Sequence, residues 1–253
     1  IVPYFEFQGE NVFYLTGGRG PLLIILPGNT ATSVAHQNEI DRYSKQFFSV
    51  SIDFLGTGKS DRLDKWPADW WEQGSHQVVA LMDHLGYNEA ALLGVSGGAI
   101  VAIAAAINYP ERIARVVADS FSLRFTDEMF NHNVLKERAQ VSDQQRTFWK
   151  MMHGDDWQNV VDKDTEMIRS VVRNGGACLS GSPKEIVCPV LLTFSAHDSF
   201  LPNVEETAAQ LERDIRRCDV KVFSVGDHPV IWTSPTEFFS EVDPFLTGNA
   251  QTL

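Results

Sequence analysis

The sequence predicts an α/β fold with a mostly parallel central sheet and helices on both faces. Two observations predict it. Short apolar, strand-like runs alternate with longer segments of helical spacing along most of the chain. A glycine-rich turn at residues 94–98 also joins one of these strands directly to a helix. A chain of 253 residues can bury its own core without disulfides or a structural metal, and α/β proteins often use this length for one unit.

The predicted strands are apolar runs that end at turn residues, and helical segments separate them. We expect strands at residues 11–15, 22–26, 47–54, 90–93, 113–118, 190–194 and 220–224. We expect helices at residues 33–46, 69–85, 97–108 and 203–215, and a closing helix from Pro235. We expect Asp69 to be the N-cap of the helix at 69–85. Gly86 is expected to end this helix, because glycine adopts the left-handed conformation found at the C-terminus of many helices.

Residues 121–183 interrupt this alternation, because their apolar side chains recur at helical spacing and form no strand-like run. Ser142 and Gln145 form a capping-box signature, and Gly175 and Gly176 would end the last helix. The sequence therefore predicts a helical insertion after the strand at 113–118. We expect a core domain made of residues 1–121 and 184–253, with residues 122–183 as the insertion.

Composition and charge exclude several classes of function. The chain has 21 basic and 33 acidic residues, a net charge of −12, which argues against nucleic-acid and anionic membrane surfaces as partners. The longest apolar run, residues 99–107, is far shorter than the ~20 residues that span a bilayer. No signal peptide is visible, and three cysteines without C-x-x-C spacing suggest reduced thiols, so we expect a cytoplasmic protein. The histidines show no metal-ligand pattern, and nothing indicates a homo-oligomer, although one is compatible with the sequence.

The strongest chemical signal is the segment Gly94-Val95-Ser96-Gly97-Gly98, a G-x-S-x-G between a predicted strand and a predicted helix. Small residues beside the serine permit the sharp turn that exposes its hydroxyl above the sheet edge. The N–H of Gly97 would lie at a helix N-terminus, where it can stabilise a developing oxyanion. In this context Ser96 is predicted to be a nucleophile.

A nucleophilic serine needs a base, and the base needs an acid that orients it. In open α/β sheets such groups lie on loops at the carboxyl ends of strands. Asp198 follows the strand at 190–194 and His228 follows the strand at 220–224, so we predict these two as acid and base. Asp119, at the end of another strand, is the alternative acid. His197 neighbours Asp198 and is interpreted as a loop residue.

These motifs together resemble the α/β-hydrolase family. The segments at 27–30 and 53–60 also occur in the order seen in this family. The resemblance runs from about residue 22 to residue 246. The resemblance implies that the insertion at 122–183 is a small helical cap. It also implies an oxyanion hole formed by the N–H groups of Asn29 and Gly97. The chain has Pro27-Gly28 where the family usually has His-Gly, and because the role of that histidine is mainly structural, we expect the Asn29 donor to be retained.

The resemblance implies a serine hydrolase that needs no cofactor and cleaves a small, fairly apolar carboxylic ester through an acyl-enzyme. A serine nucleophile argues against the family's dehalogenases and epoxide hydrolases, which use an aspartate. A carbon–carbon bond hydrolase of the same fold remains an alternative, as do action on thioesters or lactones and peracid formation. A small-molecule receptor that retains the triad is an alternative from another class, and an inactive module is disfavoured because all three triad residues are present.

Two other segments are similar to nucleotide-binding motifs but lack glycines that those motifs require. Residues 56–60 lack the first glycine of a phosphate-binding loop, since Asp53 occupies its position, and Ser96 replaces the second glycine of a dinucleotide fingerprint. Aromatic and methionine side chains in the insertion fit its own core better than a ligand pocket, and Trp70-Trp71 fits packing better than a site. Trp232, four residues after His228, is left unassigned.

Overall fold

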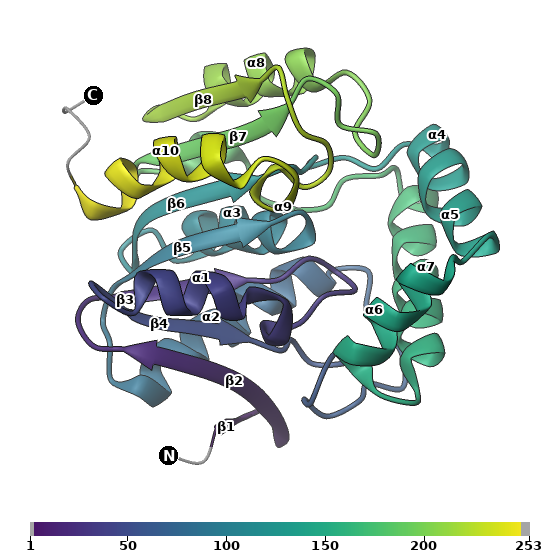
Figure 1. Ribbon diagram of the computed structural model, residues 1–253, viewed down its shortest axis with the longest axis horizontal. Helices are drawn as coiled ribbons and strands as arrows, with labels where there is room; N and C mark the ends of the chain where they lie inside the picture. Colours follow the sequence, from purple (N-terminus) through teal and green to yellow (C-terminus); the bar gives the residue numbers. More distant parts are fainter. Residues whose placement is uncertain (1–2, 249–253) are drawn as a thin grey trace.

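The computed structural model describes residues 3–248. Its centre is one eight-stranded sheet in the order β1-β2-β4-β3-β5-β6-β7-β8 (Figure 1). The strands are β1 (Tyr4–Phe7), β2 (Glu10–Gly18), β3 (Leu22–Leu26), β4 (Phe48–Ile52), β5 (Ala90–Val95), β6 (Ile113–Asp119), β7 (Val190–Ser195) and β8 (Cys218–Phe223). Strand β2 runs antiparallel to both of its neighbours, β1 and β4. The strands β4, β3, β5, β6, β7 and β8 are neighbours in this order, and each pair is parallel. The mostly parallel sheet is as predicted.

Helices cover both faces of the sheet and bury two separate apolar layers (Figure 1). Helices α2 (Trp70–Leu85), α3 (Gly97–Asn108) and α8 (Val204–Asp214) pack on one face, and α1 (Gln37–Tyr43) and α10 (Pro235–Thr247) on the other. Strands β3, β5 and β7 are buried along their whole length, as expected for central strands covered on both faces. Every side chain of α3 except Asn108 is buried, so this helix lies at the centre of the larger layer.

Two features of the fold differ from the prediction. Strand β1 was not predicted, because it has only four residues at the edge of the sheet and too little length to show a pattern. The predicted helix at 33–46 is divided into a 3₁₀ turn, η1 (Ser33–His36), and the shorter α1. Within this segment the N–H of Ser33 donates to the buried carboxylate of Asp53 at 2.8 Å, which fixes the entry into η1 from outside the segment.

Between β6 and β7 the chain forms helices α4 (Asp127–Met129), η2 (Phe130–Leu135), α5 (Lys136–Ala139), α6 (Asp143–His153), α7 (Trp157–Arg173) and η3 (Pro183–Glu185). Helices α4 to α7 stand beyond the carboxyl ends of the parallel strands (Figure 1). The predicted capping box forms at α6, where the hydroxyl of Ser142 accepts from the N–H of Gln145 and the Gln145 side chain accepts from the N–H of Ser142. Helix η2 is a single π-helical segment, a form that is often found near functional sites.

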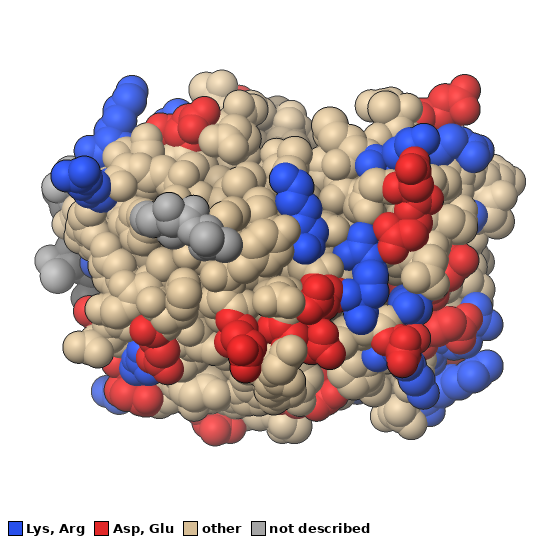
Figure 2. Space-filling model, turned by 90° about the horizontal axis from the view of Figure 1, so that it is seen from below, with Lys and Arg blue, Asp and Glu red and all other residues tan. Residues whose placement is uncertain are grey.

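Ion pairs and hydrogen bonds fasten α6 and α7 to the core. Arg62 pairs with Asp156 through two hydrogen bonds of 2.7 and 3.0 Å and also donates to the carbonyl oxygens of Gly58 and His153. Lys163 donates to the carbonyl oxygen of Leu63 at 2.6 Å. Figure 2 shows acidic and basic side chains interspersed over this end of the molecule. None of the helices within residues 3–248 is long and apolar enough to cross a bilayer.

Candidate active site

The turn that carries Ser96 is held in a strained backbone conformation. Ser96 lies between the last residue of β5 and the first of α3, with φ 54° and ψ −118°, a region that few non-glycine residues adopt. Its N–H donates to the carbonyl oxygen of Asp119 on the neighbouring strand at 2.8 Å. A side chain on Gly98 would collide with the carbonyl oxygen of Leu26, and one on Gly94 with that of Gly98. The glycines of the motif therefore permit the backbone contacts that hold this turn.

The structure brings Ser96, His228 and Asp198 into one hydrogen-bonded series. The Oγ of Ser96 is 3.0 Å from Nε2 of His228, and Nδ1 of His228 is 2.9 Å from Oδ2 of Asp198. The carboxylate of Asp198 is fully buried, and its other oxygen accepts from the N–H groups of Phe200 and Leu201 at 2.9 and 2.8 Å. These bonds fix the carboxylate so that it can hold the imidazole with Nδ1 protonated and Nε2 free to accept the serine proton.

Asp119 belongs to a different network. It is completely buried at the end of β6, where its carboxylate accepts from the Thr193 hydroxyl at 2.7 Å and from the N–H of Ile231 at 3.1 Å. Burial raises its pKa to about 6. Through Ile231 it ties the start of α9 (Val230–Thr233) to the sheet, a few residues past His228. His197, the other residue weighed at this site, is exposed.

The segment that follows β3 lies against the start of α3. A side chain on Gly97 would collide with the side chain of Asn29 and come within 3.0 Å of its backbone nitrogen. Among the described residues, no hydrogen-bond partner is found for the N–H of either Asn29 or Gly97. Two backbone N–H groups without partners therefore lie near each other beside Ser96.

The Asn29 segment is held by side chains that sequence analysis did not identify. The Oδ1 of Asn29 accepts from the Trp71 indole at 2.9 Å, and its Nδ2 donates to Asp164 at 2.8 Å. Asp164 is itself buried and paired with Arg138. Trp71 was interpreted as a packing residue, and it is fully buried, yet its N–H also orients Asn29. No local sequence pattern indicates these contacts, because each joins segments far apart in the chain.

Helix α6 holds the next residue, Thr30, at two points. Trp149 donates to its hydroxyl at 3.1 Å, and Nε2 of His153 lies 3.0 Å from its carbonyl oxygen. Since Nδ1 of His153 accepts from the N–H of Gly58 at 3.1 Å, Nε2 must carry the proton and donate to Thr30. Burial lowers the pKa of His153 from 6.5 to about 4, so the ring is neutral near pH 7. These bonds support the segment where Pro27 replaces the usual histidine.

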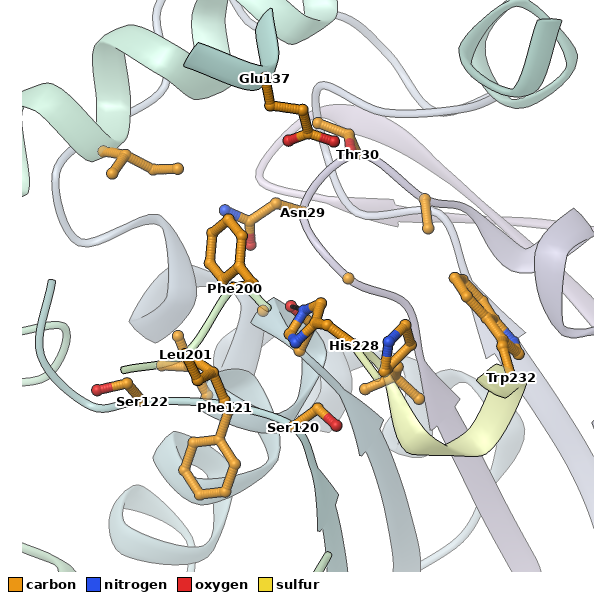
Figure 3. A pocket seen from close by; sticks show the side chains of 18 of the residues that line it. Asn29, Thr30, Ser120, Phe121, Ser122, Glu137, Phe200, Leu201, His228 and Trp232 are labelled. Atoms are coloured by element: carbon orange, nitrogen blue, oxygen red, sulfur yellow. Dashed lines mark hydrogen bonds between the residues drawn. The ribbon is translucent and has the colours of Figure 1, made fainter. Parts of the chain in front are cut away.

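A cavity of about 480 Å³ opens above Ser96, between the sheet edge and the insertion (Figure 3). Most of its wall is apolar or aromatic, including Phe121, Phe125, Phe148, Trp149, Ile168, Phe200, Leu201 and Trp232. The guanidinium of Arg138 also reaches the wall, but its charge is compensated by Asp164. In Figure 3 the Glu137 side chain points from the insertion toward Asn29 and Thr30. His228 and Trp232 lie on the other side of the cavity.

The aromatic side chains of the insertion therefore divide between two roles. Phe130 is buried away from the cavity, in the packing role that was predicted. Phe125, Phe148 and Trp149 line the cavity instead. Trp232, left unassigned by the sequence, also lines it, and its ring lies tilted against that of His36, with ring centroids 5.5 Å apart. Within residues 3–248, no group of three or more metal-ligating side chains comes together.

The comparisons with known proteins agree with this architecture. Residues 21–149, about half of the chain, match the family model described as the alpha/beta hydrolase fold. The chain belongs to the α/β-hydrolase family. The resemblance predicted from its motifs is thus confirmed, together with the fold class.

Two kinds of relatives extend the match to nearly the whole chain. Human serine hydrolase BPHL is 25% identical over 247 residues, which cover 94% of this chain and 84% of the relative. The crystal structure of E-2-(acetamidomethylene)succinate hydrolase aligns with a TM-score of 0.76 at 19% identity, covering 98% of this chain and 99% of that one. The enol-lactonase from Burkholderia xenovorans aligns equally well, with a TM-score of 0.76 at 19% identity, covering 97% and 100%. These two structural matches show a shared fold.

We expect substitution of the two buried carboxylates near His228, Asp198 and Asp119, to have different effects on activity. Asp198→Asn should lower kcat about 10³- to 10⁴-fold, because an amide at this position favours the wrong imidazole tautomer. Asp119→Asn should lower kcat less than tenfold, because its amide oxygen can still accept from Ile231. Ester hydrolysis by the two purified variants measures the difference. A larger loss in Asp119→Asn would make Asp119 the acid.

We expect His153 to make a pH-dependent contribution to the free energy of unfolding. The unfolded histidine takes up a proton as the pH falls through 6.5, whereas the folded one resists protonation until about 4, so stability is lost as the pH falls across this window. Relative to His153→Gln, the wild-type protein should lose about 3 kcal/mol of unfolding free energy between pH 7 and pH 4. Asp119, whose raised pKa acts in the opposite direction, is present in both proteins and cancels. Urea denaturation at several pH values measures the difference, and a pH-independent one would contradict the assignment.

Proposed function

We propose that the protein is a serine hydrolase that cleaves carboxylic esters with a fairly apolar acyl group. The observation that carries the proposal is the hydrogen-bonded series Asp198–His228–Ser96, with the serine on a strained turn at the floor of an apolar cavity. In this proposal Ser96 is the nucleophile, His228 the general base and acid, and Asp198 the residue that orients His228. The N–H groups of Asn29 and Gly97 form the oxyanion hole.

The reaction follows in two steps. In the first, His228 accepts the Ser96 proton as Oγ attacks the ester carbonyl carbon, and the negative carbonyl oxygen accepts hydrogen bonds from the Asn29 and Gly97 N–H groups. The carbon–oxygen bond to the alcohol then breaks, and His228 gives its proton to the departing oxygen. In the second step, water gives a proton to His228 and attacks the acyl-enzyme, and the acid is released as Oγ regains its proton.

The lining of the cavity supports an apolar acyl group. Around Ser96 the wall consists mainly of aromatic and aliphatic side chains, and the one cationic side chain on it, Arg138, is already paired with a buried carboxylate. Such a wall gains free energy by burying an apolar group and offers no free charge to an acidic one. A cavity of about 480 Å³ has the volume of ordinary small-molecule sites.

Covalent labelling and turnover test the proposal. A fluorophosphonate should add to the wild-type protein at one site per chain, seen in the intact mass, and Ser96→Ala should abolish the adduct. The wild-type protein should hydrolyse p-nitrophenyl acetate and butyrate over many turnovers, and Ser96→Ala should lower kcat by roughly 10⁶-fold if the residues act as a unit. Absence of labelling in folded protein would contradict the proposal.

The alternatives from the sequence give different results in the same assay. A small-molecule receptor with a retained triad would show one slow turnover and a large rise in thermal stability instead of repeated hydrolysis. A carbon–carbon bond hydrolase would be labelled at Ser96 but would cleave β-diketone-like substrates faster than esters of the same acyl group. Only rapid multiple turnover of esters agrees with the proposal.

A further inference from the structure

A second cavity, of about 500 Å³, shares His228 with the first and has a more polar lining. Its described lining comprises His132, Asn133, Lys136, Glu137, Gln140, Gln145, Ser199, Phe200 and His228. Phe200 is the single apolar side chain among these. Ser96, Asn29 and Gly97 border the first cavity and not the second. His228 therefore stands between an apolar compartment, which contains the serine, and a polar compartment, which does not.

We propose that the polar compartment binds the alcohol part of the substrate, so that the protein prefers esters of an apolar acid with a hydroxylated alcohol. This inference rests on the proposed function and specifies its substrate class. The acyl group stays bonded to Oγ of Ser96, with its carbonyl oxygen toward Asn29 and Gly97, so it must occupy the apolar compartment. The alcohol oxygen must come within hydrogen-bonding distance of Nε2 of His228 to receive its proton, so the rest of the alcohol extends past His228.

Four residues line both compartments: Glu137, Gln145, Phe200 and His228. The Nε2 of Gln145 donates to the Glu137 carboxylate at 2.6 Å, so each holds the other in place. Beyond this pair, His132, Asn133 and Lys136 come from η2 and the start of α5, and Asn133 is fixed by a hydrogen bond to the carbonyl oxygen of Phe200. The π-helical turn of η2 thus supplies part of the wall that faces the alcohol.

Charge selects the kind of alcohol. Lys136 and Glu137 contribute one positive and one negative charge to the polar compartment, so these two charges cancel. Its remaining lining offers amide, hydroxyl and imidazole groups, which can both donate and accept hydrogen bonds. An uncharged alcohol with several hydroxyl groups can exchange hydrogen bonds with this lining, whereas an alkyl alcohol cannot. The same side gives water access to His228 after the alcohol departs.

Matched esters test the inference. Glyceryl and n-pentyl 3-phenylpropanoate share the acid and have alcohols of equal heavy-atom number, and we expect kcat/KM to favour the glyceryl ester at least tenfold. The reversed ester, 3-phenylpropyl glycerate, places the polar part in the acid and should be hydrolysed at least tenfold more slowly than glyceryl 3-phenylpropanoate. Equal values, or a preference for the pentyl ester, would overturn the inference.

A double variant locates the preference. His132→Leu with Gln140→Leu changes two exposed side chains of the polar compartment and should lower the glyceryl-to-pentyl ratio at least fivefold. Asn131→Leu, at an exposed position on the same segment that lines neither cavity, is the matched control and should keep the wild-type ratio. Thermal unfolding shows that each variant is folded, and an unchanged ratio in the double variant would overturn the inference.

The failure of this inference is distinguishable from failure of the proposed function. If fluorophosphonate labels Ser96 and all three esters are hydrolysed without preference, the protein is an esterase and the polar compartment does not select the alcohol. If no ester is hydrolysed and no label is incorporated, the proposed function is wrong, and the inference falls with it.

Discussion

The site depends on one backbone contact, between the start of α3 and the end of β3. Gly98 has no side chain, so its backbone lies directly against the carbonyl oxygen of Leu26. This contact lets the turn at Ser96 reach the segment after β3 and sets the N–H of Gly97 beside that of Asn29. Replacement of Gly98 by a residue with a side chain would force these elements apart. The positions of Ser96 and of the Asn29 and Gly97 N–H groups thus follow from a steric constraint within the sheet.

The helical insertion does more than cover the cavity, because it also supports the segment that carries the Asn29 donor. Trp149 and His153 hold Thr30, and Asp164 holds the side chain of Asn29. Where the family usually has a histidine within this segment, the chain has Pro27 and receives a histidine from α6 instead. The insertion therefore links the wall of the cavity to the Asn29 segment beside Ser96, and changes in one would alter the other.

Much of this architecture could be predicted from local patterns. Apolar runs ended by turn residues located the central strands, and the spacing around Ser96 indicated the strand–turn–helix, because local backbone sterics dictate both. Asp198 and His228 could be named because topology brings the ends of parallel strands to one edge. The supports at Trp71, His153 and Asp164 could not, since each depends on tertiary packing between distant segments. Likewise, helical spacing alone could not show that Phe125, Phe148 and Trp149 line a cavity while Phe130 is buried in packing.

The proposed mechanism places the carbonyl oxygen of the ester that Ser96 attacks between the N–H groups of Asn29 and Gly97. A crystal structure of the protein after reaction with a fluorophosphonate carrying an apolar chain tests it most directly. We expect phosphorus bonded to Oγ of Ser96, the phosphoryl oxygen within about 3 Å of both backbone nitrogens, and the alkyl chain of the probe in the apolar compartment. A phosphoryl oxygen that points away from both donors, or phosphorus on another residue, would contradict the account.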